Sequence, residues 1–344
     1  MMELNERNRE ILWSIIQSYI DLNEPVSSHQ VTKKCSLRLS PATIRNIMAD
    51  LEKQGYLNQP YTSAGRVPTD KGYRVYVNAL IKEYDPSFNK DTLNELTCKL
   101  ECIAKDINRL IQDTSKTLSM FSRYLGVATL PKPSEMILRR IEFIKHKKNQ
   151  VLGILISEEG IVRDRIFSVE ENFFQKDLDK IAEYLNYEFK GLTLEEISAK
   201  IIFQVSTEKT ICDKLISNAL KLCNEAIAVV NNELYIDGIY EAFDLPDFAN
   251  MARIRELFNA IKDKHLIIKF LDEIMRFSGV QVFIGSENPF TEMKDLSIVA
   301  STYHDGRRTL GSIGIIGPTR MNYSDVISIV DHTAKTITQI LSAK

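Results

Sequence analysis

The sequence predicts a multidomain α+β protein, and three observations support this fold class. The chain has 344 residues, more than one hydrophobic core usually organises. Its first 84 residues show helical periodicity followed by a short strand hairpin. Strand-like segments then cluster within 134–191 and 279–344, and a mainly helical stretch, 192–278, separates them. A sheet that stops and resumes indicates an insertion inside an α/β domain of the sensor type.

Composition narrows the class of protein further. Hydrophobic residues make up 44% of the chain and charged residues 26%, which is ordinary for a folded protein. No apolar run approaches the roughly 18 residues that a membrane span requires. The opening MMELNERNRE lacks the apolar segment of a secretory signal, so we expect a cytoplasmic protein. The cysteines are odd in number and scattered, which is not a disulfide framework. They are Cys35, Cys98, Cys102, Cys212 and Cys223.

The sequence offers no pattern for catalysis or for a bound cofactor. Cys98 and Cys102 could share a helix face, but no histidine pair accompanies them, so packing in a helix seam explains them better than a metal site. The glycines of GSIGIIGP are spaced G-x-x-G-x-x-G, which is neither a dinucleotide fingerprint nor a P-loop. The motifs H-E-x-x-H, G-x-S-x-G and C-x-x-C do not occur. The His-Asp pair in YHDG, 303–306, resembles a hairpin turn. We therefore expect no enzyme, no metal and no cofactor.

The net charge of −2 conceals a local basic region. Residues 27–77 hold eight lysines and arginines against three acids, which gives this segment a charge of +5 and leaves −7 for the rest. A basic patch on an acidic remainder indicates an anionic partner that binds at one end of the chain.

The N-terminal segment predicts two helices joined by a short turn. Asn5 can cap a first helix over 5–23, whose apolar side chains recur at helical spacing. Pro25 prevents its continuation, and Ser28 can cap a short second helix that ends near Lys34.

A third helix follows, and its outer face is small and polar. Ser40 before Pro41 is a strong helix start, because the serine oxygen caps free N–H groups and proline is tolerated in the first turn. Gly55 ends the helix. The spacing directs Ile44, Ile47, Met48 and Leu51 toward the core. It leaves Ala42, Thr43, Arg45, Asn46 and Ala49 on the other face.

The segment after Gly55 predicts a hairpin beside this third helix. YLNQP and RVP have strand character and flank the small tip TSAG, with Arg66 next to it. Thr69 can cap a further helix. Helices followed by such a hairpin are typical of a winged helix-turn-helix that binds DNA. The alternatives are an outer face that packs on another domain and a basic loop that is only solvated. The residues expected to contact DNA are Ser40, Ala42, Thr43, Arg45, Asn46, Lys53, Thr62, Ser63, Gly65 and Arg66.

Two separated stretches carry a resemblance to a known family. LSPATIRNIMADLEKQGYLNQPYTSAGRVPTDKGYRVYV, 39–77, and GSIGIIGPTRMNYSDVISIVDHTA, 311–334, resemble HrcA, the family of heat-inducible transcription repressors of bacteria. The sequence departs from the family at Ile47, where an acid is expected. Because Ile47 points coreward, the departure concerns packing more than base recognition.

The resemblance implies a domain plan and partners. It implies a GAF-like antiparallel α/β domain interrupted by a mainly helical inserted dimerisation domain. We therefore divide the chain into a winged-helix domain, a helical linker, a two-segment GAF-like domain and the insertion, at 1–84, 85–133, 134–191 with 279–344, and 192–278. The linker helices could equally face a dimer partner. The resemblance also implies a homodimer on an inverted-repeat operator upstream of chaperone genes, with activity maintained by the GroE chaperonin.

Two further points stay open in the sequence. A helical seam in the insertion could form the dimer or simply pack the insertion's own core. Its residues are Leu215, Ala219 and Leu222, with Ile227 and Val230. The alternative function is a winged-helix regulator that senses a small molecule in its GAF-like domain, since such folds bind ligands elsewhere. For the repressor, we expect that heat inactivates it through loss of the folded dimer.

Overall fold

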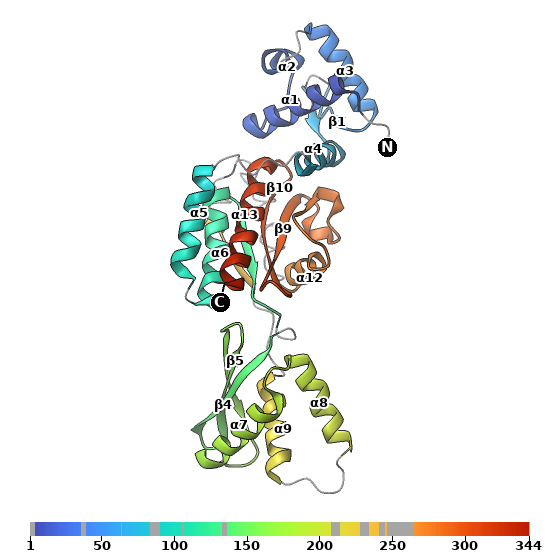
Figure 1. The fold of residues 1–344 in the computed structure, drawn as a ribbon. Helices are drawn as coiled ribbons and strands as arrows, with labels where there is room; N and C mark the ends of the chain where they lie inside the picture. The colour runs from blue at the N-terminus through green and yellow to red at the C-terminus, as the bar shows by residue number, and fades with distance from the viewer. Residues whose placement is uncertain are drawn as a thin grey trace.

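The computed structural model shows three bodies arranged in a row, with the N-terminal helices at one end (Figure 1). Within the described residues, no helix combines the length and apolar character that crossing a membrane requires. The structure describes residues 4–35, 39–62, 64–82, 90–104, 106–132, 136–207, 214–227, 234–240, 245 and 264–343.

The N-terminal body consists of helices around a small core, closed by a two-stranded ribbon. The side chains of Asn5 and Ser27 cap the first two helices by accepting hydrogen bonds from the backbone N–H groups of Asn8 and Gln30. The expected cap at Ser28 is wrong by one position, because Ser28 is already the first residue of the second helix. The apolar faces of α1 and α3 meet in this core, as their spacing predicts. The elements are α1 (Glu6–Leu22), α2 (Ser28–Lys34), α3 (Pro41–Lys53), β1 (Leu57–Asn58), β2 (Val67–Pro68) and α4 (Asp70–Lys82).

The middle body is a five-stranded antiparallel sheet in the order β7-β3-β10-β9-β8. Its strands are β3 (Leu125–Thr129), β7 (Leu234–Asp237), β8 (Gln281–Ile284), β9 (Leu296–His304) and β10 (Thr309–Pro318). Its helices are α5 (Lys90–Ile103), α6 (Ile107–Ser122), α12 (Lys264–Ile274) and α13 (Tyr323–Ser342).

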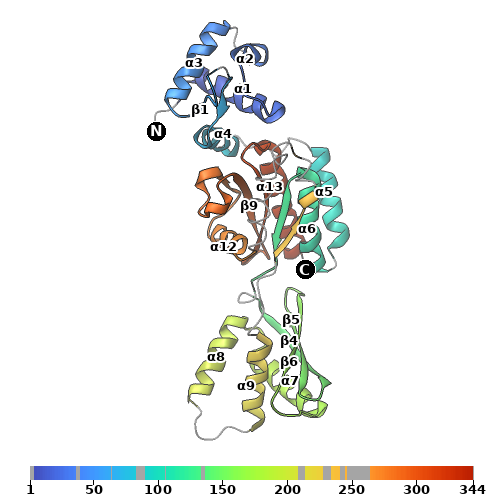
Figure 2. The ribbon, with the colours of Figure 1, turned by 180° about the vertical axis from the view of Figure 1, so that it is seen from behind.

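The helices cover both faces of this sheet (Figures 1 and 2). On one face α12 packs against apolar side chains that include Val127 and Ala300. On the other face α6 and α13 cover Ala128, Val299 and Ile313, and α5 packs on the outside of these helices. A Cβ atom at Gly126 would lie 1.9 Å from the carbonyl oxygen of Ser115, so only glycine lets α6 approach the sheet this closely.

The third body has its own sheet of three antiparallel strands in the order β4-β5-β6. Helices α7 and α9 pack against this sheet, and α8 packs on α9. The elements are β4 (Leu138–Lys147), β5 (Gln150–Ser157), β6 (Val162–Ser168), α7 (Gln175–Phe189), α8 (Leu194–Thr207) and α9 (Lys214–Ile227).

This sheet arrangement corrects the expectation that strands of 134–191 and 279–344 share one sheet. Among the described residues, the strands over 138–168 pair only with one another, whereas those over 281–318 belong to the sheet that contains β3 and β7. Residues 85–133 are likewise more than a helical linker, because 125–129 form an inner strand of the five-stranded sheet. Alternation along a segment predicts a strand but says nothing about its partner, which long-range packing selects.

Candidate nucleic-acid interface

Helix α3 begins at a well-formed cap. The Oγ of Ser40 accepts a hydrogen bond from the backbone N–H of Thr43 at 3.2 Å and lies 2.9 Å from the Thr43 hydroxyl. Pro41 occupies the first helical position, as the sequence predicts. The cap therefore fixes the backbone of the first turn and holds the Thr43 hydroxyl beside it.

The two faces of α3 differ sharply in burial. Ile44, Met48 and Leu51 are almost fully buried in the N-terminal core. Ala42, Arg45 and Asn46 are exposed on the opposite face, while Thr43 is half-buried. Ile47 is partly buried against the same core, which agrees with its coreward spacing. Within the described residues Arg45 takes part in no ion pair, so its guanidinium is available to a ligand.

The hairpin beside α3 is held by backbone and side-chain hydrogen bonds. β1 and β2 pair antiparallel, with Asn58 opposite Val67. At the tip, the Nε2 of Gln59 donates to the carbonyl oxygens of Thr62 and Ala64, at 2.9 and 3.0 Å. Ser63 lies outside the described residues, and Thr62 is exposed. These bonds give the tip a defined shape.

The returning arm of the hairpin also touches the loop after α1. Val26 and Arg66 exchange two backbone hydrogen bonds, of 2.9 and 2.8 Å. A Cβ atom at Gly65 would lie 2.4 Å from the carbonyl oxygen of Val26, so the approach requires glycine. The hairpin is therefore anchored on the helical core through Gly65 and Arg66, just before β2.

Arg66 does not extend freely from the hairpin. Its Nε lies 2.8 Å from the Oε2 of Glu52 on α3, and only 18% of the Arg66 side chain is exposed. Lys53 is by contrast 80% exposed and lies 3.9 Å from Asp50, a weak surface contact. The ion pair links the returning arm of the hairpin to the C-terminal half of α3, a contact that the sequence does not predict.

Several other positive charges of this region are engaged within the chain. Lys34 pairs with Asp21 at 2.7 Å. The ammonium group of Lys71 donates to the carbonyl oxygen of Gln54 at 2.8 Å and lies 4.5 Å above the Tyr56 ring. The local charge of +5 is thus less available to an anionic partner than the sequence count indicates.

The helical seam expected to form a dimer is placed in the third body. Ala219 and Leu222 are buried, at 0% and 2% exposure, in the core between α9, its neighbouring helices and the sheet. Leu215 lies on α9, and Val230 lies outside the described residues. Packing within the third body accounts for Ala219 and Leu222, because both side chains are buried in its core.

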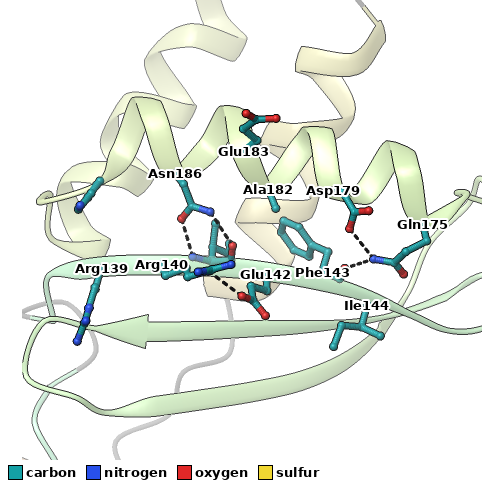
Figure 3. A pocket seen from close by; sticks show the side chains of 12 residues that line it. Arg139, Arg140, Glu142, Phe143, Ile144, Gln175, Asp179, Ala182, Glu183 and Asn186 are labelled. Carbon is teal, nitrogen blue, oxygen red and sulfur yellow. Dashed lines mark hydrogen bonds and ion pairs between the residues drawn. The ribbon is translucent and has the colours of Figure 1, made fainter.

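A cavity of about 600 Å³ lies between β4 and α7 of the third body (Figure 3). The amide of Asn186 bonds both the N–H and the carbonyl oxygen of Ile141, at 2.7 and 2.9 Å. Gln175 donates to Phe143 and Asp179. The cavity therefore borders β4, an edge strand whose outward backbone groups at Ile141 and Phe143 are already hydrogen-bonded by side chains of α7. The cavity lies in the third body, away from the five-stranded sheet. In the described part of the chain, no group of three or more His, Cys, Asp and Glu side chains could hold a metal ion.

Comparison with known proteins shows which class of protein the chain belongs to. Residues 108–327 match the family described as HrcA protein C terminal domain. A relative from Thermodesulfovibrio yellowstonii is 40% identical over 98% of both chains, and one from Geobacter sulfurreducens is 40% identical over 100% of both. Both relatives are named heat-inducible transcription repressor HrcA. A crystal structure described as a hypothetical protein shares the fold, with a TM-score of 0.68, 22% identity and 99% of both chains covered.

These matches assign the chain to the transcription repressors, a class of regulators rather than of enzymes. Because the identity reaches 40% along the whole length, the chain belongs to the HrcA family of heat-inducible transcription repressors.

Proposed function

We propose that the protein represses transcription by binding an inverted-repeat DNA operator with its N-terminal body, as a winged helix-turn-helix. The observation that carries this proposal is the exposed outer face of α3, where Ala42, Arg45 and Asn46 project from a capped first turn. In helix-turn-helix proteins these turns enter the major groove and contact base edges. The anchored hairpin stands in the position of a wing.

The other two bodies fit the roles that the family resemblance implies. The five-stranded antiparallel sheet, covered by helices on both faces, supports a GAF-like domain. The chain leaves this sheet after β3 and returns to it at β7, and the third body lies between them. We propose that this third body, 136–227, is the inserted dimerisation domain.

One face of the three-stranded sheet is suited to a partner. Gly153 faces Phe143, Phe167 and the α9 residue Ala226, so the helices cover that face. The opposite face carries Ile144, Val162 and Ile166, which are all more than 40% exposed. The cross-strand rows on this open face are Ile144–Leu152–Ile166, Glu142–Ile154–Asp164 and Arg140–Ile156–Val162.

We propose that two copies of the chain bury this open face against each other. A two-fold operator requires a two-fold protein, and the six aliphatic side chains of the face are concentrated on a single surface. The proposal moves the dimer contact from the α9 seam to the β4-β5-β6 sheet.

For the heat response, we propose that warming inactivates the repressor through loss of the folded dimer. Domains are stable by only about 5–15 kcal/mol, so the unfolded fraction rises steeply on heating. In this proposal the GroE chaperonin returns the protein to its DNA-binding form, as the family resemblance implies.

The test combines footprinting with a heat step. Purified protein is bound to DNA from upstream of the organism's own chaperonin genes, and the protected bases are mapped. We expect a protected inverted repeat, loss of binding together with increased light scattering after heating, and recovery with GroE and ATP. An absence of protection at every chaperone promoter would contradict operator binding. Loss of binding by a protein that stays folded and dimeric would favour the small-molecule alternative, which a thermal-shift screen with metabolites then tests.

A further inference from the structure

An ion pair connects the N-terminal body to the middle body. Arg74 of α4 directs its guanidinium at Glu287, which lies in the short 3-10 helix η3 (Gly285–Glu287) after β8. The Nε of Arg74 donates to Oε1 of Glu287 at 2.8 Å, and its terminal nitrogen bonds Oε2 and also the carbonyl oxygen of Val282 at 2.6 Å. A bidentate arginine–carboxylate pair fixes the relative orientation of the two side chains as well as the distance between them.

A second contact lies one helical turn away on the same helix. The Oδ2 of Asp70 accepts hydrogen bonds from the backbone N–H of Ser286 at 2.9 Å and from its hydroxyl at 2.7 Å. Gly285 has a φ of +51°, and a Cβ atom there would lie 2.6 Å from the carboxylate oxygens. The backbone at this point is therefore shaped to receive the Asp70 side chain.

Two more contacts surround this pair. The ring of Tyr73 lies 5.6 Å from that of Tyr323, at the start of α13. The hydroxyl of Tyr323 is buried and lies 2.7 Å from Oγ of Ser297. Arg320 donates to the carbonyl oxygen of Ile20, near the end of α1. The N-terminal body is thus held at several points, and it cannot turn about α4 without breaking charged contacts.

We infer that Asp70 and Arg74 are positioning residues, which fix the direction of α3 relative to the middle body and thereby set the operator half-site spacing that the repressor accepts. The inference rests on the proposed function. In a two-fold dimer, the contacts between the N-terminal and middle bodies, most of them made by α4, fix where each DNA-binding helix lies relative to its half-site. Insertion of one base pair moves a half-site by about 3.4 Å and turns it by roughly a tenth of a turn. A rigid contact converts that displacement into lost affinity, and a loose one absorbs it.

The experiment measures affinity against spacing with the full-length protein. The probe is the promoter fragment protected by the wild type, with one to five base pairs inserted between its half-sites. A fragment that carries one half-site is measured in parallel. For the wild type we expect a loss of at least roughly tenfold in affinity for the first inserted base pair. For Arg74→Ala and Glu287→Ala we expect a loss of about threefold or less, with unchanged affinity for the single half-site.

A double variant separates positioning from a general loss of structure. We call the loss of affinity against the number of inserted base pairs the spacing profile. Since Arg74 and Glu287 act as one pair, the double variant Arg74→Ala with Glu287→Ala should have a spacing profile no flatter than that of either single variant. Arg74→Lys keeps the charge without the two-pronged geometry and should give an intermediate profile. Arg109→Ala is the matched control, because it removes an exposed arginine that pairs only weakly with Asp113 at 3.8 Å.

The outcomes distinguish the inference from the function on which it rests. A wild-type protein that protects no inverted repeat contradicts the proposed function. If the wild type binds and the variants lose as much affinity per inserted base pair as the wild type does, the positioning role is overturned. Additive flattening in the double variant overturns it as well, because two independent changes would then be weakening the fold.

Discussion

The carboxylate of Glu52 holds the guanidinium of Arg66 at 2.8 Å, which ties the hairpin to the C-terminal half of α3. The sequence places Arg66 among the residues expected to contact DNA, and we propose here that it reaches the minor groove or an adjacent phosphate. A DNA phosphate must therefore compete with Glu52 for the same guanidinium. If Arg66 contacts DNA as proposed, the pair would couple hairpin position to DNA binding, because the guanidinium would have to leave Glu52 to reach the phosphate.

This competition predicts opposite effects for the two partners. Arg66→Ala should reduce the magnitude of the slope of log affinity against log salt by about one, since one phosphate contact is lost. Glu52→Gln should tighten binding, because Arg66 no longer has an internal carboxylate. Titrations of the operator at several KCl concentrations measure both. If the Glu52→Gln gain persists in the double variant Glu52→Gln with Arg66→Ala, the gain reflects general charge and the hairpin stays off the DNA.

The exposed guanidinium of Arg45 is the strongest candidate for base recognition. A two-pronged contact to guanine is worth ~1–3 kcal/mol of discrimination, so Arg45→Ala should weaken operator binding by that amount and relax specificity at one base pair. Affinities for the operator, for single-base variants and for unrelated DNA measure the effect. Equal weakening on all three would assign Arg45 to a phosphate instead. Arg109→Ala on α6 is the control for loss of one arginine.

Local chemistry in the sequence was sufficient to predict the N-terminal helices. Caps such as Asn5 and Ser40 act within three residues, and the apolar spacing of α3 identifies its buried face from the sequence alone. The partner of Arg66 could not be predicted in the same way. Glu52 is fourteen positions earlier, and only the folded hairpin brings the two side chains together.

The sheets show where sequence patterns fail. The strand β3 is a run of five buried residues, LGVAT, between helix α6 and the segment LPKP, and it has no alternation to distinguish it from the helical stretch. The strands over 138–168 were predicted as strands, but their separate sheet was not, because pairing depends on contacts far apart in the chain. The burial of Ala219 could not be predicted without knowing that a sheet lies beneath α9. An apolar stripe on a helix has the same sequence pattern whether it faces a core or a dimer partner.

The open face of the β4-β5-β6 sheet should hold the dimer together. Ile154→Asp places a charge in the middle of its aliphatic rows, where burial against a second copy would be costly. We expect a monomer in sedimentation velocity and weak binding to single half-sites. Tyr187→Asp, on an 88% exposed side chain of α7, is the matched control and should stay dimeric. A dimeric Ile154→Asp together with a monomeric Tyr187→Asp would move the interface to α7.

The amides on α7 should protect the free edge of β4. Asn186 satisfies both backbone groups of Ile141, and Gln175 bonds Phe143 and Lys145, so the edge has few groups left for another strand. Asn186→Ala leaves a partly buried N–H and carbonyl without a partner, which should cost about 1–3 kcal/mol of stability. Urea unfolding measures the loss, and light scattering detects the strand pairing that the bare edge permits. Glu183→Ala, at an exposed position of the same helix, should change neither.

The stability of the middle body should fall in mild acid because of His332. This side chain lies between α13 and α5, with its Nε2 2.7 Å from the Thr97 hydroxyl. Burial lowers the pKa of His332 below its usual 6.5, although the Asp331 charge and a hydrogen bond with Leu93 act in the opposite direction. In the unfolded chain the imidazole takes up a proton near pH 6.5, whereas in the folded chain it does so only at lower pH.

Proton uptake therefore favours unfolding as the pH falls through 6.5, and the stability present above that pH is progressively lost. We expect the urea midpoint to decrease between pH 7.5 and 5.5 by more in the wild type than in His332→Gln, which has no imidazole to protonate. His146→Gln, near the end of β4, controls for the loss of a histidine elsewhere in the chain. An equal decrease in the wild type and His332→Gln would show that other groups carry the acid sensitivity. A larger decrease in His332→Gln would mean that the folded state binds the proton more tightly than the unfolded one, which is the reverse of the effect that burial produces.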